Sequence, residues 1–321
     1  RTSPDTFFVR QARIETSGTF FKDYEYKVQA DFPTGTSSTS GTLQDGYLGW
    51  IRIPELKVRI GQFKEPFSQE ETTTTRFIDF DERSVLNRLA PARDVGIMIH
   101  GSFLEKVIEY EAGVFNGSGR ALVDTNDEKD LAIRVRANPF INGDQKILKQ
   151  LRLGAALTLG DVDTAGSSPL DFTTTELSNM FMDATAGTVD GQRTRIGLEI
   201  SWLYGPGSLR SEWVRRTDEV DIGTFSDEEI DMDAWYVALS WVVTGEDKAL
   251  ENRLKPENAF DLEKGDWGAV EVVARIASLD VDENIFDVGN VVCLPLQKCL
   301  NNHVLVDEAP FEATLRWIIG T

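Results

Sequence analysis

Basic side chains recur on the polar faces of short segments in which apolar and polar residues alternate. Alternation places successive side chains on opposite faces of a β-strand. By this register, cations on the polar faces are Arg13, Lys57, Arg59, Arg134, Arg136, Arg152, Arg195, Arg210 and Arg275, and Lys64 follows one such segment. A guanidinium stays charged and binds phosphate oxygens through two parallel hydrogen bonds. This pattern predicts a surface that recognises anions.

Carboxylates occupy the same polar faces. They are Glu15, Glu25, Asp31, Asp45, Glu109, Glu111, Glu199, Glu212 and Glu271. Opposite charges on neighbouring strands pair with each other, so these acids are also consistent with structural Arg–Glu contacts. Two interpretations therefore stay open: a series of anion-binding arginines, and a polar lining with weak or no selectivity.

The chain has few residues that could support catalysis or metal binding. Its two histidines, His100 and His303, are far apart in sequence, and no Gly-x-Ser-x-Gly motif accompanies them. A hydrolase needs a nucleophile with a base within reach, so we predict no catalytic residue, metal ligand or cofactor. The acidic run at 218–233 fits calcium ligation only loosely. Cys293 and Cys299 are compatible with a disulfide or with two free thiols.

Composition narrows the class further. The 53 acidic and 33 basic residues give a formal charge of −20, which excludes nucleic acid as an expected partner. With 41% hydrophobic residues the chain can form a folded core. Its best apolar stretch, 234–243, is far shorter than the ~18 residues of a transmembrane helix, whereas a transmembrane β-strand needs only ~10 alternating residues.

The alternating segments predict about thirteen strands and almost no helix. In residues 23–32, for example, Tyr24, Tyr26 and Val28 alternate with Glu25 and Lys27. A soluble β-sandwich would place mainly Lys and Glu on its outer face, whereas these polar faces mix Arg, Glu and Gly, as a water-filled lumen does. We therefore expect an all-β, transmembrane, antiparallel up-and-down β-barrel.

Connection lengths alternate as well. Tight turns are expected at 19–23, 54–55, 103–106 and 204–208, and long connections at 33–43, 64–92, 116–129 and 161–192. Outer-membrane barrels have short turns in the periplasm and long loops outside. The first strand should run toward a short turn, and the chain stops at Ile319, Gly320 and Thr321 without a terminal aromatic. We therefore expect strands to be missing at the ends, because bacterial barrels close with an even number.

The run Val58-Arg59-Ile60-Gly61-Gln62-Phe63-Lys64-Glu65-Pro66-Phe67-Ser68 resembles a signature of the phosphate-selective porin family, the O and P type of Gram-negative outer membranes. Further resemblances follow in the family's order, over about residues 8 to 280. They are Arg10-Gln11-Ala12-Arg13, Leu43-Gln44-Asp45-Gly46-Tyr47-Leu48, Asp81-Glu82-Arg83-Ser84, Gly113-Val114-Phe115-Asn116-Gly117, Thr244-Gly245-Glu246 and Gly268-Ala269-Val270-Glu271.

The resemblance implies a 16-stranded barrel, a homotrimer in outer-membrane lipid, and a channel that passes phosphate or other inorganic anions through a lumen lined by arginine and lysine. The family folds some loops inward. Residues 64–92 are the candidate constriction loop, since they carry Lys64, Arg76, Arg83 and Arg88. The connection 244–266 is longer than the short turns expected on the periplasmic side, and it is a second candidate for an inward fold.

We therefore predict a single domain, 1–321, that acts as an outer-membrane porin for passive diffusion of small solutes and ions. Outward aromatic residues, among them Tyr24, Trp50, Trp202, Trp213, Trp235 and Trp241, are candidates for interfacial girdles or subunit contacts. The alternative is a structural or anchoring barrel that scaffolds a surface layer or a membrane complex. Residues 288–308, which do not resemble the family, would then be the partner site.

Overall fold

The computed structural model describes residues 9, 11–32, 41–120, 127–163, 172–173, 180–184, 188–222, 225–248, 254–282, 291–293, 299–300, 303–304 and 311–318. Most of the predicted partner site at 288–308 and the side chains of Cys293 and Cys299 lie outside this part of the chain.

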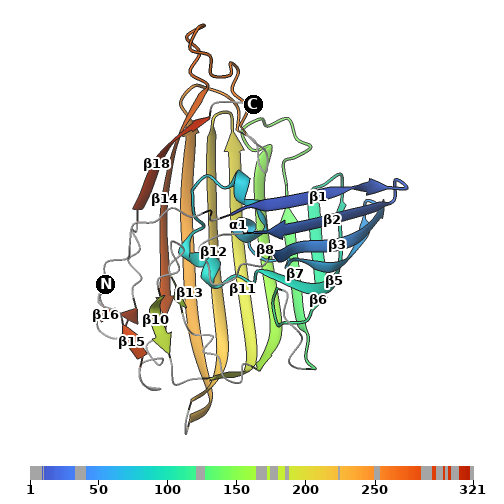
Figure 1. The fold of residues 1–321 in the computed structure, drawn as a ribbon, viewed down its shortest axis with the longest axis vertical. Helices are drawn as coiled ribbons and strands as arrows, with labels where there is room; N and C mark the ends of the chain where they lie inside the picture. Colours follow the sequence, from blue (N-terminus) through green and yellow to red (C-terminus); the bar gives the residue numbers. More distant parts are fainter. Residues whose placement is uncertain are drawn as a thin grey trace.

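One antiparallel sheet dominates the fold (Figure 1). Within the described residues it has 13 strands: β1 (Arg13–Phe20), β2 (Tyr24–Asp31), β3 (Thr42–Ile53), β4 (Leu56–Lys64), β5 (Arg93–Phe103), β6 (Ile108–Phe115), β7 (Asp130–Ala137), β8 (Gln150–Asp163), β11 (Thr188–Tyr204), β12 (Gly207–Ile222), β13 (Phe225–Val242), β14 (Ala269–Val281) and β18 (Phe311–Ile318). They pair in chain order, as an up-and-down sheet does. The predicted total of 16 strands stays a prediction.

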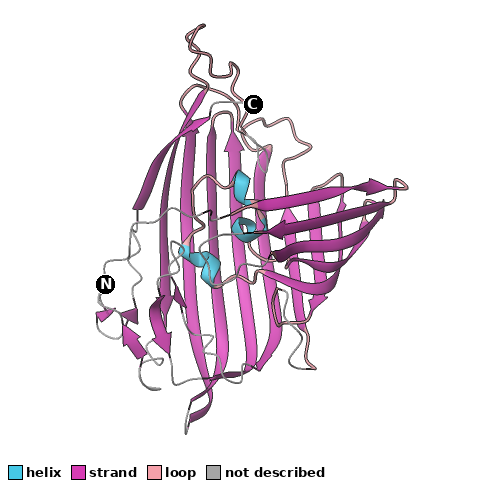
Figure 2. Ribbon diagram, in the orientation of Figure 1, coloured by secondary structure: helices cyan, strands magenta, loops and turns pink. Residues whose placement is uncertain are grey.

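The remaining elements are short. β15 (Val291–Cys293), β10 (Met180–Ala184) and β9 (Phe172–Thr173) form a small sheet, and β16 (Cys299–Leu300) pairs with β17 (His303–Val304). Helical structure is confined to α1 (Gln69–Thr72) and the 3₁₀ turns η1 (Thr75–Phe77) and η2 (Val85–Arg88) (Figure 2). Among the helices described, none has the length and apolar character needed to cross a membrane. The prediction of an all-β fold with almost no helix is confirmed.

The two faces of the large sheet differ in chemistry. On one face, which we call the outer face, large apolar side chains stand at alternate positions and remain exposed: Ile14 (70%), Ile60 (58%), Leu198 (52%) and Leu239 (53%). The other, inner face carries the charged residues and the small ones. Apolar exposure on this scale is expected of a surface that meets lipid rather than water.

Aromatic rings gather on the outer face beside the tight turns. The ring pairs are Phe20 with Tyr24 (5.4 Å between centroids), Phe103 with Tyr110 (5.4 Å) and Trp202 with Tyr204 (6.4 Å). All three pairs lie at strand ends beside a short turn, so they lie at the same end of the strands. Amphipathic rings favour the level of the lipid headgroups, so this end of the sheet has the composition of an interfacial belt.

Residues 65–92, which we call the inner segment, join β4 to β5 and fold back across the inner face of the later strands (Figure 1). Phe67, Leu86 and Leu89 of this segment are at most 1% exposed, and they share a core with Val214 of β12 and Met232 of β13. Burial of apolar surface stabilises this arrangement. The inner face of β13 and β14 is therefore largely apolar and covered, whereas β12 also places Arg210, Glu212 and Arg216 there and the inner face of β1–β7 is mainly charged.

Gly61 allows β4 to approach β3 closely, because it has no side chain. Its φ is +131°, and a Cβ there would lie 2.2 Å from the Gly46 carbonyl oxygen. We expect Gly61→Ala to lower the free energy of unfolding by about 1–3 kcal/mol, because the side chain meets backbone and the conformation is strained. The measurement is the urea midpoint of the protein folded in liposomes. Gly143→Ala, whose Cβ would make only ordinary contacts, is the matched control; equal midpoints for the two variants would contradict the argument.

Candidate functional site

The inner segment is fastened first by a carboxylate of β12. Glu212 accepts hydrogen bonds from the backbone N–H groups of Gln69 (2.8 Å) and Glu70 (2.7 Å), and the Tyr236 hydroxyl donates to it (2.8 Å). Ser68 caps the same turn, since its Oγ accepts from the N–H of Glu71 (3.1 Å). These bonds satisfy N–H groups that the first turn of a helix leaves without partners.

A second fastening joins the segment to β14. The Glu70 carboxylate accepts from the N–H (2.9 Å) and the hydroxyl (2.5 Å) of Ser84 and from the Arg275 guanidinium (3.1 Å). Arg275 also donates to the Glu82 carbonyl (3.0 Å) and lies over the ring of Phe80, 4.3 Å from its centroid. Burial raises the pKa of Glu70, while Arg275 and Ser84 oppose that rise. A removed partner would leave the other charge buried, which is costly.

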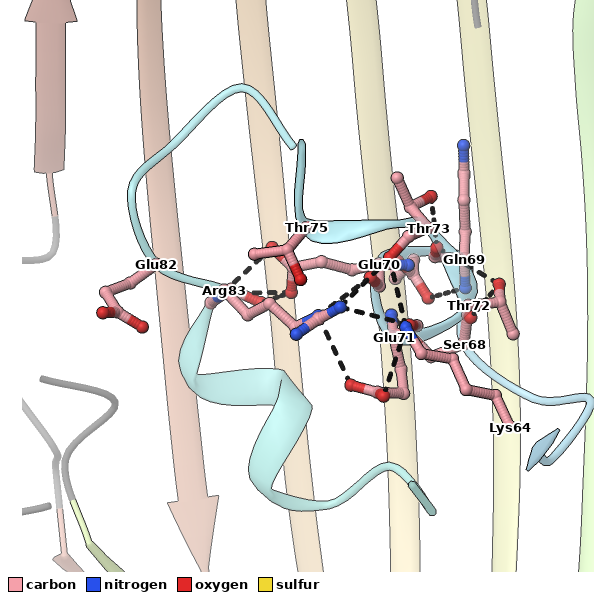
Figure 3. Close-up of polar contacts among 12 residues, drawn as sticks. Lys64, Ser68, Gln69, Glu70, Glu71, Thr72, Thr73, Thr75, Glu82 and Arg83 are labelled. Atoms are coloured by element: carbon pink, nitrogen blue, oxygen red, sulfur yellow. Dashed lines mark hydrogen bonds and ion pairs between the residues drawn. The ribbon is translucent and has the colours of Figure 1, made fainter. Parts of the chain in front are cut away.

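Lys64 and Arg83 organise the segment from within (Figure 3). Lys64 Nζ donates to the carbonyl oxygens of Glu71 and Thr73, and Arg83 donates to those of Glu70 (3.1 Å), Glu71 (3.3 Å) and Thr73 (3.0 Å). Arg83 also forms a salt bridge with the Glu71 carboxylate (3.3 Å). Both predicted cations thus bind the backbone of the turn, which holds its shape.

The opposite end of the sheet contacts the same segment. Arg13 of β1 donates to the Thr75 hydroxyl (3.4 Å) while it pairs with Asp31 (2.8 Å), and Arg76 lies 3.7 Å from Glu15 of β1. The segment therefore touches β1 on one side and β14 on the other. This requires the sheet to curl so that its early and late strands face each other across the segment.

The connection after β13 also reaches the inner face. Lys248 is 7% exposed, and its Nζ lies 2.8 Å from Asp79 of the inner segment, 2.5 Å from Glu271 of β14 and 2.6 Å from the Ser240 hydroxyl. Farther along the connection, Leu262 is 71% exposed. In the described part of the predicted inward stretch 244–266, the start thus reaches the interior, whereas Leu262 is exposed.

Several strand cations are held by carboxylates. Arg59 lies 2.9 Å from Glu25 and over the Tyr47 ring, 4.3 Å from its centroid. Arg134 is 2% exposed and bonds Glu199 at 2.7 and 2.9 Å. Arg136 lies 3.8 Å from both Glu109, its register partner, and Glu111. Arg136 and Glu109 pair between neighbouring strands, whereas Arg59–Glu25 and Arg134–Glu199 join strands that are two apart in the sheet.

Other predicted cations differ in their surroundings. Within the described residues, no carboxylate forms a salt bridge with Arg195, Arg210 or Lys57, and the Nε atoms of Arg195 and Arg210 are buried without a hydrogen-bond partner. In the described part of the chain, the one hydrogen bond of the Arg195 side chain runs to the Thr158 hydroxyl (3.3 Å). The two that remain are partly buried: Arg152 on the inner face of β8, and Arg88 at the end of η2.

A cavity of about 500 Å³ opens on the inner face where the inner segment rejoins the sheet. Its lining residues are Glu65, Ala90, Pro91, Ala92, Arg93, Gly117, Ser118, Gly119, Arg120, Asp130 and Arg195. This cavity brings one predicted cation, Arg195, together with two arginines that the sequence did not single out. Arg93 is bound to Asp45 (2.6 Å), whereas Arg120 donates to the neutral amide oxygen of Gln44 (2.8 Å).

An antiparallel sheet with an apolar exposed face, a charged inner face and an inward-packed connection has the construction of a β-barrel pore protein. The chain belongs to the family of phosphate-selective porins O and P, whose family model matches residues 2–291. It is accordingly an outer-membrane porin of the Gram-negative type, and the family resemblance and the expected location are confirmed. Porins are channels rather than enzymes.

Individual relatives are more distant. Porin O of Pseudomonas aeruginosa is 24% identical over 311 residues, which cover 87% of this chain and 68% of that protein. Among solved structures, outer-membrane OmpT of Vibrio cholerae aligns over 84% of this chain and 79% of its own, with 13% identity and a TM-score of 0.45. The outer-membrane channel DcaP of Acinetobacter baumannii aligns over 84% and 78%, with 11% identity and a TM-score of 0.42.

The contacts that hold the inner segment against the strands were not predicted from the sequence. Glu212 was placed on the inner face only as one carboxylate among nine, and Glu70, Tyr236 and Lys248 were not singled out. One signal could have indicated them. Val214, Met232 and Ala234 put apolar side chains on inner positions where a water-filled lumen requires polar ones, which implies that something covers them.

Proposed function

We propose that this chain forms a water-filled channel for passive diffusion of small solutes and inorganic anions, phosphate among them, as a homotrimer in the outer membrane. The inner segment narrows the channel. The observation that carries the proposal is that this segment is held across the inner face by a partly buried contact from β1 and by buried contacts from β12 and β14. A constriction that is held from both sides determines which ions must lose their hydration shell as they pass.

The proposed preference for anions is modest. Arg59, Arg134 and Arg136 are largely neutralised by Glu25, Glu199, Glu109 and Glu111. The proposed preference comes from cations without an ion-pair partner among the described residues, above all Arg210, which is 9% exposed and lies beside the inner segment. The family's name supports phosphate as a permeant, and we include it on that ground.

The test is the reversal potential of the purified protein in a planar bilayer under a potassium chloride gradient, repeated with added phosphate. We expect anion selectivity and a current that millimolar phosphate reduces. Arg210→Gln should raise the half-blocking phosphate concentration about threefold, which corresponds to about 0.6 kcal/mol. Arg52→Gln, at a 68% exposed side chain beside a turn, should leave it unchanged.

Three other outcomes would each overturn one part of the proposed function. A cation-selective pore, or one indifferent to phosphate, would overturn the anion preference and leave a general porin. A protein that folds but conducts nothing would overturn transport in favour of the anchoring barrel. The same preparation should have a protein mass in detergent of three times 35.9 kDa; a mass of one chain would overturn the trimer.

A further inference from the structure

The cavity at the junction of the inner segment with β4 and β5 has two sides of opposite charge. Glu65 and Asp130 are 5% and 6% exposed, and Arg195 is 8% exposed. All three line the cavity together with Arg120. Its volume of about 500 Å³ is within the range of sites that bind small organic molecules.

Two buried polar atoms at this cavity have no hydrogen-bond partner among the described residues. Glu65 Oε2 is an acceptor and Arg195 Nε is a donor. A buried donor or acceptor left unmade costs free energy, so each such case in a folded protein calls for an explanation. Glu65 and Arg195 line the same space without forming a salt bridge with each other. A molecule that supplies an acceptor to one and a donor to the other would satisfy both.

The guanidinium groups of Arg195 and Arg120 on one side of the cavity can still donate hydrogen bonds. The described partner of Arg195 is a hydroxyl, that of Thr158 at 3.3 Å, and the described partner of Arg120 is the neutral amide oxygen of Gln44 at 2.8 Å. Each guanidinium carries five N–H donors, so both can still bind a carboxylate. A simple anion would satisfy this side only, and it would face the carboxyl groups of Glu65 and Asp130 across the cavity.

We propose that this cavity binds small zwitterions of the amino-acid class, with the ligand carboxylate on Arg195 and Arg120 and its ammonium group on Glu65 and Asp130. The inference deepens the proposed function, since it names a class of permeant that the channel would hold on its way to the constriction. Ammonium and carboxylate groups together complete the hydrogen bonds that the protein leaves open, which neither group does alone.

The protonation of Glu65 gives the site a distinctive pH dependence. Burial raises the pKa of Glu65 to about 8; Arg195 and Arg193 of β11 lower it, and Asp130 of β7 and Asp94 of β5 raise it. Glu65 is thus largely neutral at pH 7 and becomes a carboxylate by pH 9. An ammonium group binds the carboxylate better, so zwitterion affinity should increase over this interval. A primary alkylamine resembling the lysine side chain, with a pKa of about 10.4, stays charged throughout.

The experiment uses three probes with the same three-carbon chain: β-alanine, propionate and propylammonium. Each is titrated against the chloride current of the whole protein in a planar bilayer. We expect β-alanine to reach half-block at a concentration about tenfold lower than either single-charge probe, and this concentration should fall from pH 7 to pH 9. Glu65→Gln should raise it about tenfold and abolish its pH dependence, and Arg195→Gln should raise it about tenfold. Arg52→Gln should change nothing.

Equal half-blocking concentrations for β-alanine and propionate in the unmodified protein would overturn the zwitterion site, and this comparison needs no variant to fold. So would an unchanged pH profile in Glu65→Gln. Failure of the site is distinguishable from failure of the channel. If no current flows, the three probes are titrated calorimetrically against the detergent-solubilised protein. Tighter binding of β-alanine would then uphold the site, and equal or absent binding would overturn it.

Discussion

Replacing Glu70 by alanine is expected to increase the single-channel conductance. Glu70 is 7% exposed, and its carboxylate holds Arg275 of β14 at 3.1 Å and the N–H and hydroxyl of Ser84. Removal of one partner of a buried ion pair costs about 3–5 kcal/mol, because the remaining charge stays without a counter-charge. The inner segment loses its link to β14, so it is no longer held across the lumen and the open pore widens.

The measurement is the conductance of single channels in potassium chloride, with current noise as a second readout. Glu70→Gln keeps an acceptor for Ser84 but removes the charge that Arg275 requires, so an intermediate conductance is expected. Asp261→Ala serves as the acidic control, since Asp261 forms its ion pair with Lys264 (2.8 Å) in an exposed turn away from the inner segment. A conductance of Glu70→Ala equal to that of the unmodified channel would show that this carboxylate does not hold the constriction.

Replacing Arg134 by alanine should make the channel more cation-selective and less stable. Arg134 is 2% exposed, bonds Glu199 at 2.7 Å and the Thr72 hydroxyl at 3.0 Å, and lies 3.7 Å from Glu111. Among the described residues, its loss leaves Glu199 without an ion-pair partner and Glu111 with Arg136 alone, which favours potassium over chloride at that level of the pore. The loss of a buried charge partner should lower the free energy of unfolding by about 3–5 kcal/mol.

Reversal potentials and urea midpoints measure the two effects separately. Arg134→Lys keeps the charge but lacks the planar fork, so selectivity should stay near that of the unmodified channel while stability falls. In the double variant Arg134→Ala with Glu199→Ala, the selectivity should return toward the original value, because the uncompensated charge has been removed. If Arg134→Ala left the reversal potential unchanged, the ion path would not pass this pair.

Local patterning was enough to predict the strands and their faces. The alternation in residues 23–32 corresponds to β2 (Tyr24–Asp31), and Lys57 and Arg59, which we assigned to polar faces, lie in β4 (Leu56–Lys64). A period of two is set by the strand itself. For the same reason Ile60, the neighbour of Arg59, lies on the exposed apolar face. The tight turns at 54–55 and 204–208 also lie between paired strands, as expected.

Long-range contacts could not be read in this way. The bond from Gln69 to Glu212 spans 143 residues, and no local pattern pairs these positions. The family resemblance indicated that 64–92 folds inward, yet it did not indicate which groups receive it. Whether an inner arginine is paired or open also depends on register: Arg136 stands opposite Glu109, whereas Arg195 stands opposite Thr158. The connection 138–149, between β7 and β8, breaks the short-turn rule and was not anticipated.

The contact between Glu70 and Arg275 joins residues that are 205 positions apart. During synthesis and membrane insertion, the inner segment therefore exists long before the strands that receive it. Its apolar side chains, Phe67 and Leu86 among them, have no place to pack until β12–β14 have joined the sheet. Contacts of such separation form late in folding. We therefore expect the assembling protein to pass through a state with a wide lumen and an uncovered apolar segment, with narrowing of the pore following the joining of β12–β14.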